Sequence, residues 1–329
     1  MKRGLKTFAA GFALMGGLFF SAVPAHAEVV KVDKSLKPYQ KVSGISGNLN
    51  SIGSDTMNNL LTLWAEGFKK IYPNVNLQME GKGSATAPPA LTEGVAQLGP
   101  MSRDMKAQEV DGFEAKRGFK PTRFRVAVDG LAVYVNKDNP VKKLSLSQLD
   151  AIFGKQRKRG AGENITTWGQ LGLADKYVSA PIVMFGRNSA SGTYGYFKEH
   201  TLAKGDFKDE VKEQPGSAAV VQGVTEERNA IGYSGMGYMT SGVRTVPLSE
   251  KDGGEVFSDS AENIYSGKYP LSRFLNIYVA KDPKKGLDPL AKEFIKFIYS
   301  KEGQEVVLKD GFLPMLGKDI DKELEQLGK

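Results

Sequence analysis

A short apolar strand, a turn rich in hydroxyl groups and glycine, and a helix recur along this chain, and that repeated unit limits the folds open to it. Residues 181–185 form an apolar run that leads into such a turn, and a helix is predicted over residues 194–202. Residues 49–53 likewise predict a strand, and the apolar positions between Met57 and Ile71 recur at spacings of three and four, which indicates one helix face. Strands that alternate with helices predict an α/β fold with mainly parallel sheets.

The turn after residue 185 has the composition of an anion-binding site. Arg187 offers a planar charged fork, Ser191 and Thr193 add hydroxyl donors, and Gly192 lets a ligand approach its backbone. A helix that begins here leaves backbone N–H groups unpaired and carries a partial positive charge. The alternative interpretation is that Ser191 only caps the helix and that Arg187 is a surface charge.

Similar turns follow three other predicted strands. In the first, Ser54 and Thr56 repeat the hydroxyl chemistry, although Ser54 or Asp55 could equally cap the following helix. The second is the glycine-rich segment 80–87, and the third follows the strand predicted over residues 96–101. Ligands lie beyond the carboxyl ends of strands in open parallel sheets, so the turns predict an oxyanion site in a cleft between two domains.

The first 27 residues have the pattern of a cleaved secretory signal peptide. Three basic residues precede an apolar run over residues 8–20, and the small residues Ala25 and Ala27 mark a cleavage site before Glu28. The apolar run is too short for a membrane span. The remaining chain of roughly 300 residues exceeds what one core usually organises, so two domains are expected.

Composition argues against several functional classes. The chain has no cysteine, and of its two histidines His26 belongs to the signal peptide, which leaves His200 at the end of a predicted helix, where a capping role is expected. Disulfides, thiolate ligands, a cysteine nucleophile and a lipid-bearing cysteine are excluded. We therefore expect no metal, no cofactor and a freely diffusing exported product, located in the periplasm of a cell with two membranes. Removal of the three basic residues of the signal peptide takes the formal net charge from +8 to +5, and this positive balance favours the arrival of anions.

Two apolar runs are long enough to pass between the domains. Residues 124–135 are interrupted by Asp129, which needs either a structural partner or a role in ligand contact, and residues 274–280 form the second crossing. The basic run 155–159 contains no interleaved aromatic residues, so it is predicted to be a solvated loop and not a nucleic-acid surface.

Six elements in the same order resemble those of the PstS-type phosphate-binding proteins, the periplasmic receptors of ABC phosphate importers. They are Gly53-Ser54-Asp55-Thr56-Met57, the Gly83-Ser84 loop, Val128-Asp129-Gly130-Leu131-Ala132-Val133, Arg187 with Ser191-Gly192-Thr193, Ala230-Ile231-Gly232-Tyr233 and Tyr269-Pro270-Leu271-Ser272-Arg273. The resemblance implies the two-lobed type II periplasmic-binding fold, with two crossings that form a hinge. We expect residues 28–129 and 270–329 to form lobe I, and residues 130–269 to form lobe II.

The resemblance also implies the phosphate ligands. From lobe I we expect hydroxyl and backbone donors, and from lobe II a charged contact from Arg187 with a shell of further donors. The full predicted set is Ser54, Thr56, Met57, Ser84, Arg103, Asp129, Arg187, Ser191, Gly192 and Thr193.

One position departs from the family pattern. Well-known members carry an Asp in the third turn, which accepts the proton of hydrogen phosphate and so rejects sulfate, whereas this chain has Arg103 there. Asp104 is adjacent, but neighbouring side chains at a strand end point in opposite directions. Asp129 is therefore the candidate acceptor, with Asp55 as the second choice.

These observations predict a monomeric, non-catalytic receptor that binds inorganic phosphate and delivers it to a membrane-embedded ABC permease. One alternative is an exported phosphomonoesterase that uses Thr56 or Ser191 as nucleophile, although no base or metal cluster accompanies either residue. Another is an adhesion or matrix protein that keeps the fold without the anion. A receptor for another tetrahedral oxyanion, such as sulfate or molybdate, stays within the first class.

Overall fold

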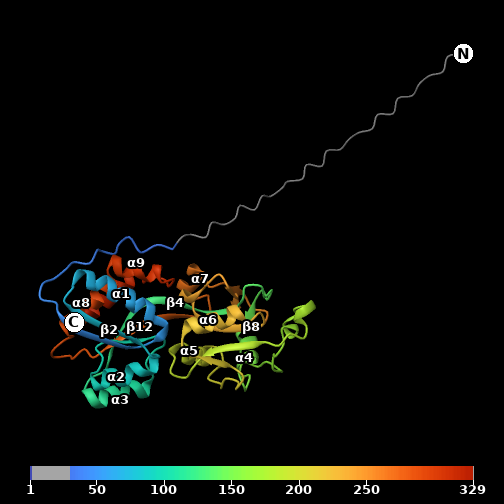
Figure 1. Cartoon of the computed structure of the whole chain (residues 1–329), viewed down its shortest axis with the longest axis horizontal. Coiled ribbons are helices and arrows are strands. Elements are labelled where there is room, and N and C mark those ends of the chain that lie inside the picture. Colours follow the sequence, from blue (N-terminus) through green and yellow to red (C-terminus); the bar gives the residue numbers. More distant parts are fainter. Residues whose placement is uncertain (2–29, 329) are drawn as a thin grey trace.

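The computed structural model describes residue 1 and residues 30–328, and the described chain forms two bodies (Figure 1). One body carries α1, α2, α3, α8 and α9, the other carries α4, α5, α6 and α7, and β4 extends between them. We call these bodies lobe I and lobe II. The predicted signal peptide, apart from Met1, lies outside the described residues. Between residues 30 and 328, no helix combines the length and the apolar character that a membrane span requires.

Lobe I is assembled from both ends of the described chain. Its elements are β1 (Gly47–Gly53), α1 (Asn58–Ile71), β2 (Val75–Gly81), α2 (Ala87–Glu93), β3 (Gly99–Met101), α3 (Ala107–Arg117), β12 (Ser272–Val279), α8 (Pro289–Tyr299), α9 (Lys301–Lys309) and α10 (Gly317–Gly328). The apolar face predicted for α1 is buried: Trp64 and Phe68 are inaccessible to solvent, and the ring of Phe68 packs edge-to-face on that of Phe294, with centroids 5.3 Å apart. This packing fixes the turn before α1 relative to the rest of the lobe.

Lobe II is formed by the middle of the chain. Its elements are β5 (Leu144–Ser145), α4 (Leu146–Phe153), β6 (Val183–Arg187), α5 (Gly192–His200), β7 (Lys212–Gln214), α6 (Ser217–Glu226), β8 (Ala230–Gly235), β9 (Val243–Thr245), β10 (Leu248–Ser249), β11 (Val256–Phe257) and α7 (Ala261–Tyr265). Phe197 of α5 stacks on Tyr233 of β8, with ring centroids 3.9 Å apart, and Phe153 of α4 packs edge-on against both rings. The position of α5 is therefore set by an aromatic core.

β4 (Thr122–Asn136) is the strand that connects the two lobes. It pairs antiparallel with β12 from Thr122 to Gly130, and from Leu131 to Val135 it pairs antiparallel with β8. The resulting sheet has the order β3-β12-β4-β8-β6-β7, with β9 also paired to β4. Its antiparallel pairs all include β4 or β12, whereas β6 pairs in parallel with β7 and β8, and β1 pairs in parallel with β2. The predicted parallel arrangement thus holds for these strands and for β5 with β10, whereas β10 pairs antiparallel with β11.

Several element boundaries differ from the sequence prediction. The polar interval before β4 contains α3, and the charged tail forms α10; neither helix was predicted. The third strand, predicted over residues 96–101, is confined to Gly99–Met101. α3 escaped prediction because it buries only Phe113 and therefore has little apolar periodicity.

Candidate functional site

Strand ends of lobe I meet at the junction between the lobes. The backbone N–H of Ser54, after β1, donates to the carbonyl of Pro100 in β3 at 2.8 Å. After β2, the hydroxyl oxygen of Ser84 accepts the backbone N–H of Ser102 at 3.0 Å and lies 3.3 Å from the Ser102 hydroxyl. The turns after β1, β2 and β3 therefore share one polar surface, as the carboxyl ends of neighbouring strands do.

The N-terminus of α5, from lobe II, packs directly on this surface. Oγ1 of Thr193 lies 2.8 Å from Oγ1 of Thr56, which is a hydrogen bond between the lobes. A Cβ atom added to Gly192 would lie 2.2 Å from Oγ of Ser84, so only glycine permits this approach. Oγ of Ser191 accepts two backbone N–H groups of α5 at 3.1 and 3.3 Å. Ser191 therefore does cap the helix, as the alternative interpretation of this residue expected.

Arg187, the last residue of β6, is buried, with 1% of its side chain exposed. Its guanidinium lies 3.0 Å from a carboxylate oxygen of Asp55 and donates to Oγ of Ser217 at 2.6 Å and to the carbonyl of Pro215 at 3.2 Å. Within the described chain, Nε of Arg187 is buried without a hydrogen-bond partner. Burial lowers the pKa of Arg187 and the carboxylate of Asp55 opposes that effect, so the group stays charged. Arg187 is not a surface charge.

Asp55 joins the lobes instead of capping α1. Its Oδ1 accepts the backbone N–H of Ser217 at 2.8 Å, and the hydroxyl of Tyr238 donates to the carbonyls of Asp55 and Thr56, each at 3.1 Å. Ser54 does not cap a helix either, and in the described part of the chain its buried hydroxyl has no partner. The Ser54 hydroxyl and Nε of Arg187 are thus two buried polar atoms of the junction that find no hydrogen-bond partner among the described residues.

A second buried ion pair lies at the crossing strands, and of its two residues only Asp129 was predicted to belong to the site. Arg273 of β12 and Asp129 of β4 are directly opposite each other in the antiparallel register. The guanidinium donates through Nε to Asp129 at 2.8 Å, and a second nitrogen lies 2.6 Å from the same oxygen. It also donates to the carbonyl of Ser102 at 2.8 Å and to Oγ1 of Thr193 at 3.0 Å. Arg273 therefore connects the hinge, the third turn and α5.

The sequence did contain a signal for this pair. Asp129 interrupts an apolar run and so required a partner, and Arg273 ends one of the six family-like elements. The other oxygen of Asp129 accepts the backbone N–H of Met236 at 3.0 Å. A carboxylate has about four acceptor positions, so the three donors named here leave room for one ligand hydroxyl.

Arg103 lies away from this cluster. Its guanidinium is held in a two-point contact by Glu109, at 2.8 and 2.7 Å, and also donates to the carbonyl of Asp104. The structure therefore does not bring the Arg103 guanidinium to Thr56 and Thr193. The backbone N–H of Met57, another predicted donor, makes a long hydrogen bond of 3.3 Å to the carbonyl of Ser54.

The assembled cluster is suited to holding an anion. Two guanidinium groups balance two carboxylates, so a bound anion would be stabilised chiefly by hydroxyl and amide hydrogens and by the positive end of α5. Among residues 30–328, no group of three or more His, Asp or Glu side chains could hold a metal ion. His200 stacks on Tyr196, with ring centroids 4.1 Å apart, and burial lowers its pKa.

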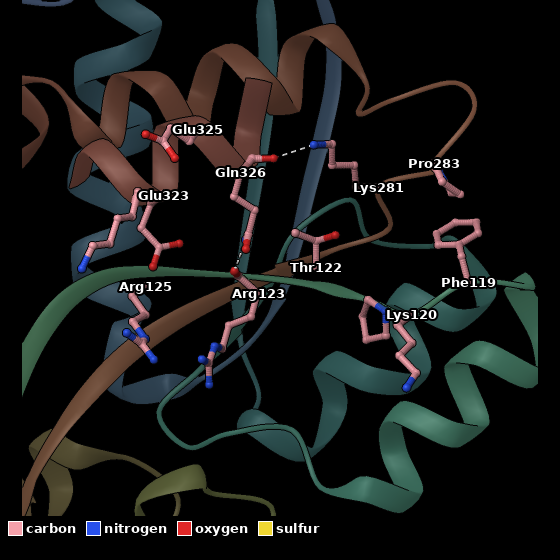
Figure 2. Close-up of a pocket in the computed structure, with 12 residues that line it drawn as sticks. Phe119, Lys120, Thr122, Arg123, Arg125, Lys281, Pro283, Glu323, Glu325 and Gln326 are labelled. Carbon is pink, nitrogen blue, oxygen red and sulfur yellow. Dashed lines mark hydrogen bonds between the residues drawn. The ribbon is translucent and has the colours of Figure 1, made fainter. Parts of the chain in front are cut away.

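A cavity of about 910 Å³ lies elsewhere, between the first half of β4 and α10 (Figure 2). Its walls include Lys120, Arg123 and Glu323, and none of the predicted site residues lines it. This cavity is therefore not the candidate site, although it is large.

Comparison with known proteins bears on this site. Residues 40–302 match the PBP superfamily domain. The chain is 54% identical over 317 residues to the phosphate-binding protein PstS of Pseudomonas aeruginosa, and this match covers 96% of this chain and 98% of that protein. It is 29% identical over 280 residues to the phosphate-binding protein PstS of Bacillus subtilis, which covers 84% of each chain. One similar crystal structure is that of a substrate-binding protein from Clostridium perfringens, which is assigned to a phosphate ABC transporter and contains bound phosphate. It superimposes with a TM-score of 0.68 at 30% sequence identity, and the match covers 82% of this chain and 99% of that chain.

Proposed function

The chain belongs to the PBP superfamily and, within it, to the PstS phosphate-binding proteins, and from this premise we propose that it binds inorganic phosphate between its lobes and delivers it to an ABC importer. The fold class expected from the sequence, a two-lobed type II periplasmic-binding fold, is confirmed by this membership and by the architecture described above. β4 changes partner between Gly130 and Leu131, which supports a lobe boundary next to the proposed 129/130; we also propose that the chain returns to lobe I at 269/270.

The convergence of donors from both lobes is the observation that carries this proposal. Thr56 and Ser84 approach from lobe I, Gly192 and Thr193 approach from lobe II, and the inter-lobe hydrogen bond between Thr56 and Thr193 lies at the centre. A dehydrated dianion requires many such donors in place of its lost water. We place the phosphate where it takes over the Thr56–Thr193 hydrogen bond and reaches the unpartnered Nε of Arg187.

The remaining contacts follow from the same geometry. We assign further donor roles to the hydroxyls of Ser54 and Ser191, the backbone N–H of Met57 and the guanidinium of Arg273. Asp129 is the proposed acceptor for the phosphate proton, because one acceptor position remains after its three protein donors are counted. Arg103 is not assigned to the direct shell, since Glu109 holds its guanidinium.

We propose that the protein acts without catalysis. Oγ of Ser191 is committed to capping α5, and Oγ1 of Thr56 is bonded to another hydroxyl, so neither candidate nucleophile is paired with a general base. We further propose export through the signal peptide, a periplasmic monomer, and docking of the phosphate-loaded form on a membrane-embedded permease. No nucleic-acid role is proposed, because two cations of the basic run 155–159 are paired with carboxylates, Lys155 with Asp209 and Arg159 with Glu250.

Calorimetric titration of the phosphate-stripped protein tests the proposal. We expect one tight site for phosphate and arsenate, and much weaker binding of sulfate at pH 7, because sulfate has no proton for Asp129 to accept. Equal affinity for sulfate would remove the selectivity assigned to Asp129, and the absence of phosphate binding would overturn the proposed function. Release of phosphate from a chromogenic ester, abolished by Thr56→Val, would instead support the phosphomonoesterase.

A further inference from the structure

A groove between the lobes lies on the Arg103 side of the proposed phosphate site. Two hollows of about 460 and 690 Å³ share Arg103, Lys106, Gly195 and Glu199 as walls, so they are parts of one groove. Ser191 lines one hollow and Arg273 lines the other. Both residues also belong to the buried cluster, so the groove borders the proposed phosphate site.

The two sides of the lobe junction differ. On the Asp55 side, hydrogen bonds from Ser217 and Tyr238 tie lobe II directly to lobe I. On the groove side, the aliphatic part of the Arg103 side chain packs against Gly195. A Cβ atom added to Gly195 would lie 3.2 Å from Cδ of Arg103. The two hollows border the cluster on this side of the junction.

Positive charge is concentrated in this groove. Its walls carry seven Lys or Arg residues and two carboxylates. Most of the cations are paired with a carboxylate in the groove or just behind it. The pairs are Arg103–Glu109, Arg123–Asp104, Lys198–Asp206, Lys204–Glu199 and Arg273–Asp129.

Two cations remain after this pairing, namely Lys106 and Arg125. Neither has a carboxylate oxygen within the 4.0 Å of an ion pair among the described residues. Lys106 stands at the start of α3, where both oxygens of the neighbouring Glu109 are held by Arg103. The guanidinium of Arg125 lies 4.6 Å from the ring centroid of Phe274, which positions it without neutralising it.

Figure 2 shows how Arg125 is directed. Arg123 and Arg125 extend from β4 away from α10, whose carboxylates Glu323 and Glu325 lie on the other side of the strand. Glu323 makes no ion pair with Arg125, but the charge of Arg125 partly offsets the rise that burial causes in the pKa of Glu323. Arg125 lines the groove together with Arg273 and Phe274, and it also lines the cavity between β4 and α10.

We propose that Lys106 and Arg125 form an outer phosphate-collecting site, at which a phosphate ion is held before it enters the buried site. This inference rests on the proposed function. Two unpaired cations on the walls of a concave groove focus the field and raise the local anion concentration. They lie outside the buried cluster, so they act on the rate of capture and leave the final contacts unchanged.

Rapid-mixing kinetics with inorganic phosphate test the proposal. The chain has no cysteine, so Lys82→Cys provides a single labelling position beside the junction that does not line the groove. The double variant Lys106→Gln/Arg125→Gln is compared with Lys318→Gln/Arg228→Gln, which removes the same charge from exposed positions outside the groove.

At an ionic strength of about 0.01 M, we expect the groove variant to bind phosphate about fivefold more slowly than the control. The dissociation rate should stay within about twofold, and the difference in association should vanish near 1 M salt, where the Debye length is about 3 Å. Equal association rates for both double variants would overturn the proposal while leaving the proposed function intact. If neither variant nor the parent binds phosphate, both fail together.

The charge-retaining variant Arg125→Lys separates charge from packing. If charge collects the anion, Arg125→Lys should associate at nearly the parent rate, whereas Arg125→Gln should be slow. If both single variants are equally slow, the packing of Arg125 on Phe274 is responsible, and the collecting site is refuted.

Discussion

Two buried guanidinium–carboxylate pairs flank the proposed phosphate site, and they differ in how they are built. Arg187 and Asp55 come from different lobes, at the end of β6 and in the turn after β1, and the side chain of Asp55 is 24% exposed. Arg273 and Asp129 come from adjacent antiparallel strands, and their side chains are 2% and 0% exposed. The first pair can part when the lobes separate, whereas the second is fixed by strand register.

This difference indicates that two chemically similar ion pairs have different roles, one in folding and one in lobe closure. An ion pair without access to water leaves an uncompensated buried charge when one partner is removed, whereas a partly exposed carboxylate can be rehydrated. We therefore expect the Arg273 pair to matter most for folding and the Arg187 pair to matter most for lobe closure on phosphate.

The largest expected effect is on stability. Arg273→Ala should lower the free energy of unfolding by about 3–5 kcal/mol, because Asp129 is left fully buried without its cation. Urea unfolding measures this loss, with Arg244→Ala as a control, since Arg244 is a half-buried arginine in lobe II that contacts backbone carbonyls. A loss no larger than that of the control would remove the distinction between the pairs.

The next effect is on affinity. Arg187→Ala should weaken phosphate binding by about 10²–10³-fold, because the dianion and the closed form both lose their charged partner. The stability loss should be smaller than for Arg273→Ala, since Asp55 can be hydrated. Calorimetry measures the affinity, and Arg187→Lys should recover only part of it because lysine cannot reproduce the planar fork. Unchanged affinity in Arg187→Ala would contradict the site.

A third prediction concerns selectivity. Asp129→Asn should weaken phosphate binding by at least about tenfold, because the amide no longer offers a carboxylate to the phosphate proton. Sulfate binding should change much less, since the neutral amide of this variant does not repel a fully ionised anion. The matched control is Asp150→Asn, a buried carboxylate of lobe II outside the site. Equal losses for phosphate and sulfate would remove Asp129 from the acceptor role.

The smallest effect comes from a carboxylate that has no guanidinium partner among residues 30–328. Asp310 is held by Asn59, and burial raises its pKa from 3.8 to about 6. The folded state therefore binds more protons than the unfolded state between these values, so stability falls as pH rises through this window. Asp310→Asn should gain stability relative to the parent between pH 4 and 6 in urea titrations. A difference that is independent of pH would contradict this assignment.

The sequence predicted the parts of the site that depend on local pattern. The apolar periodicity of α1 and the strand-to-helix turns locate Thr56, Ser84 and Thr193 because each lies at the end of a local unit. A resemblance over six ordered elements then indicated the fold. These features need no knowledge of how distant segments meet.

Partners of the charged residues could not be predicted in this way. Asp129 required a counterion, but Arg273 is 144 positions away and is identified only by the β4–β12 register. Whether Asp55 caps a helix or pairs with Arg187 depends on how closely the lobes approach. Arg103 was expected in the site from its position in the third turn, yet its partner Glu109 lies on α3, a helix with too little apolar pattern to be predicted.

The central claim is that one anion is held by groups from both lobes. A crystal structure of the mature protein with arsenate tests it most directly, because arsenic can be located by its anomalous scattering. We predict an arsenic peak between Thr56 and Thr193, with oxygens within hydrogen-bond distance of both hydroxyls and of Nε of Arg187. An arsenic peak outside the junction, or one contacted by a single lobe, would contradict the account.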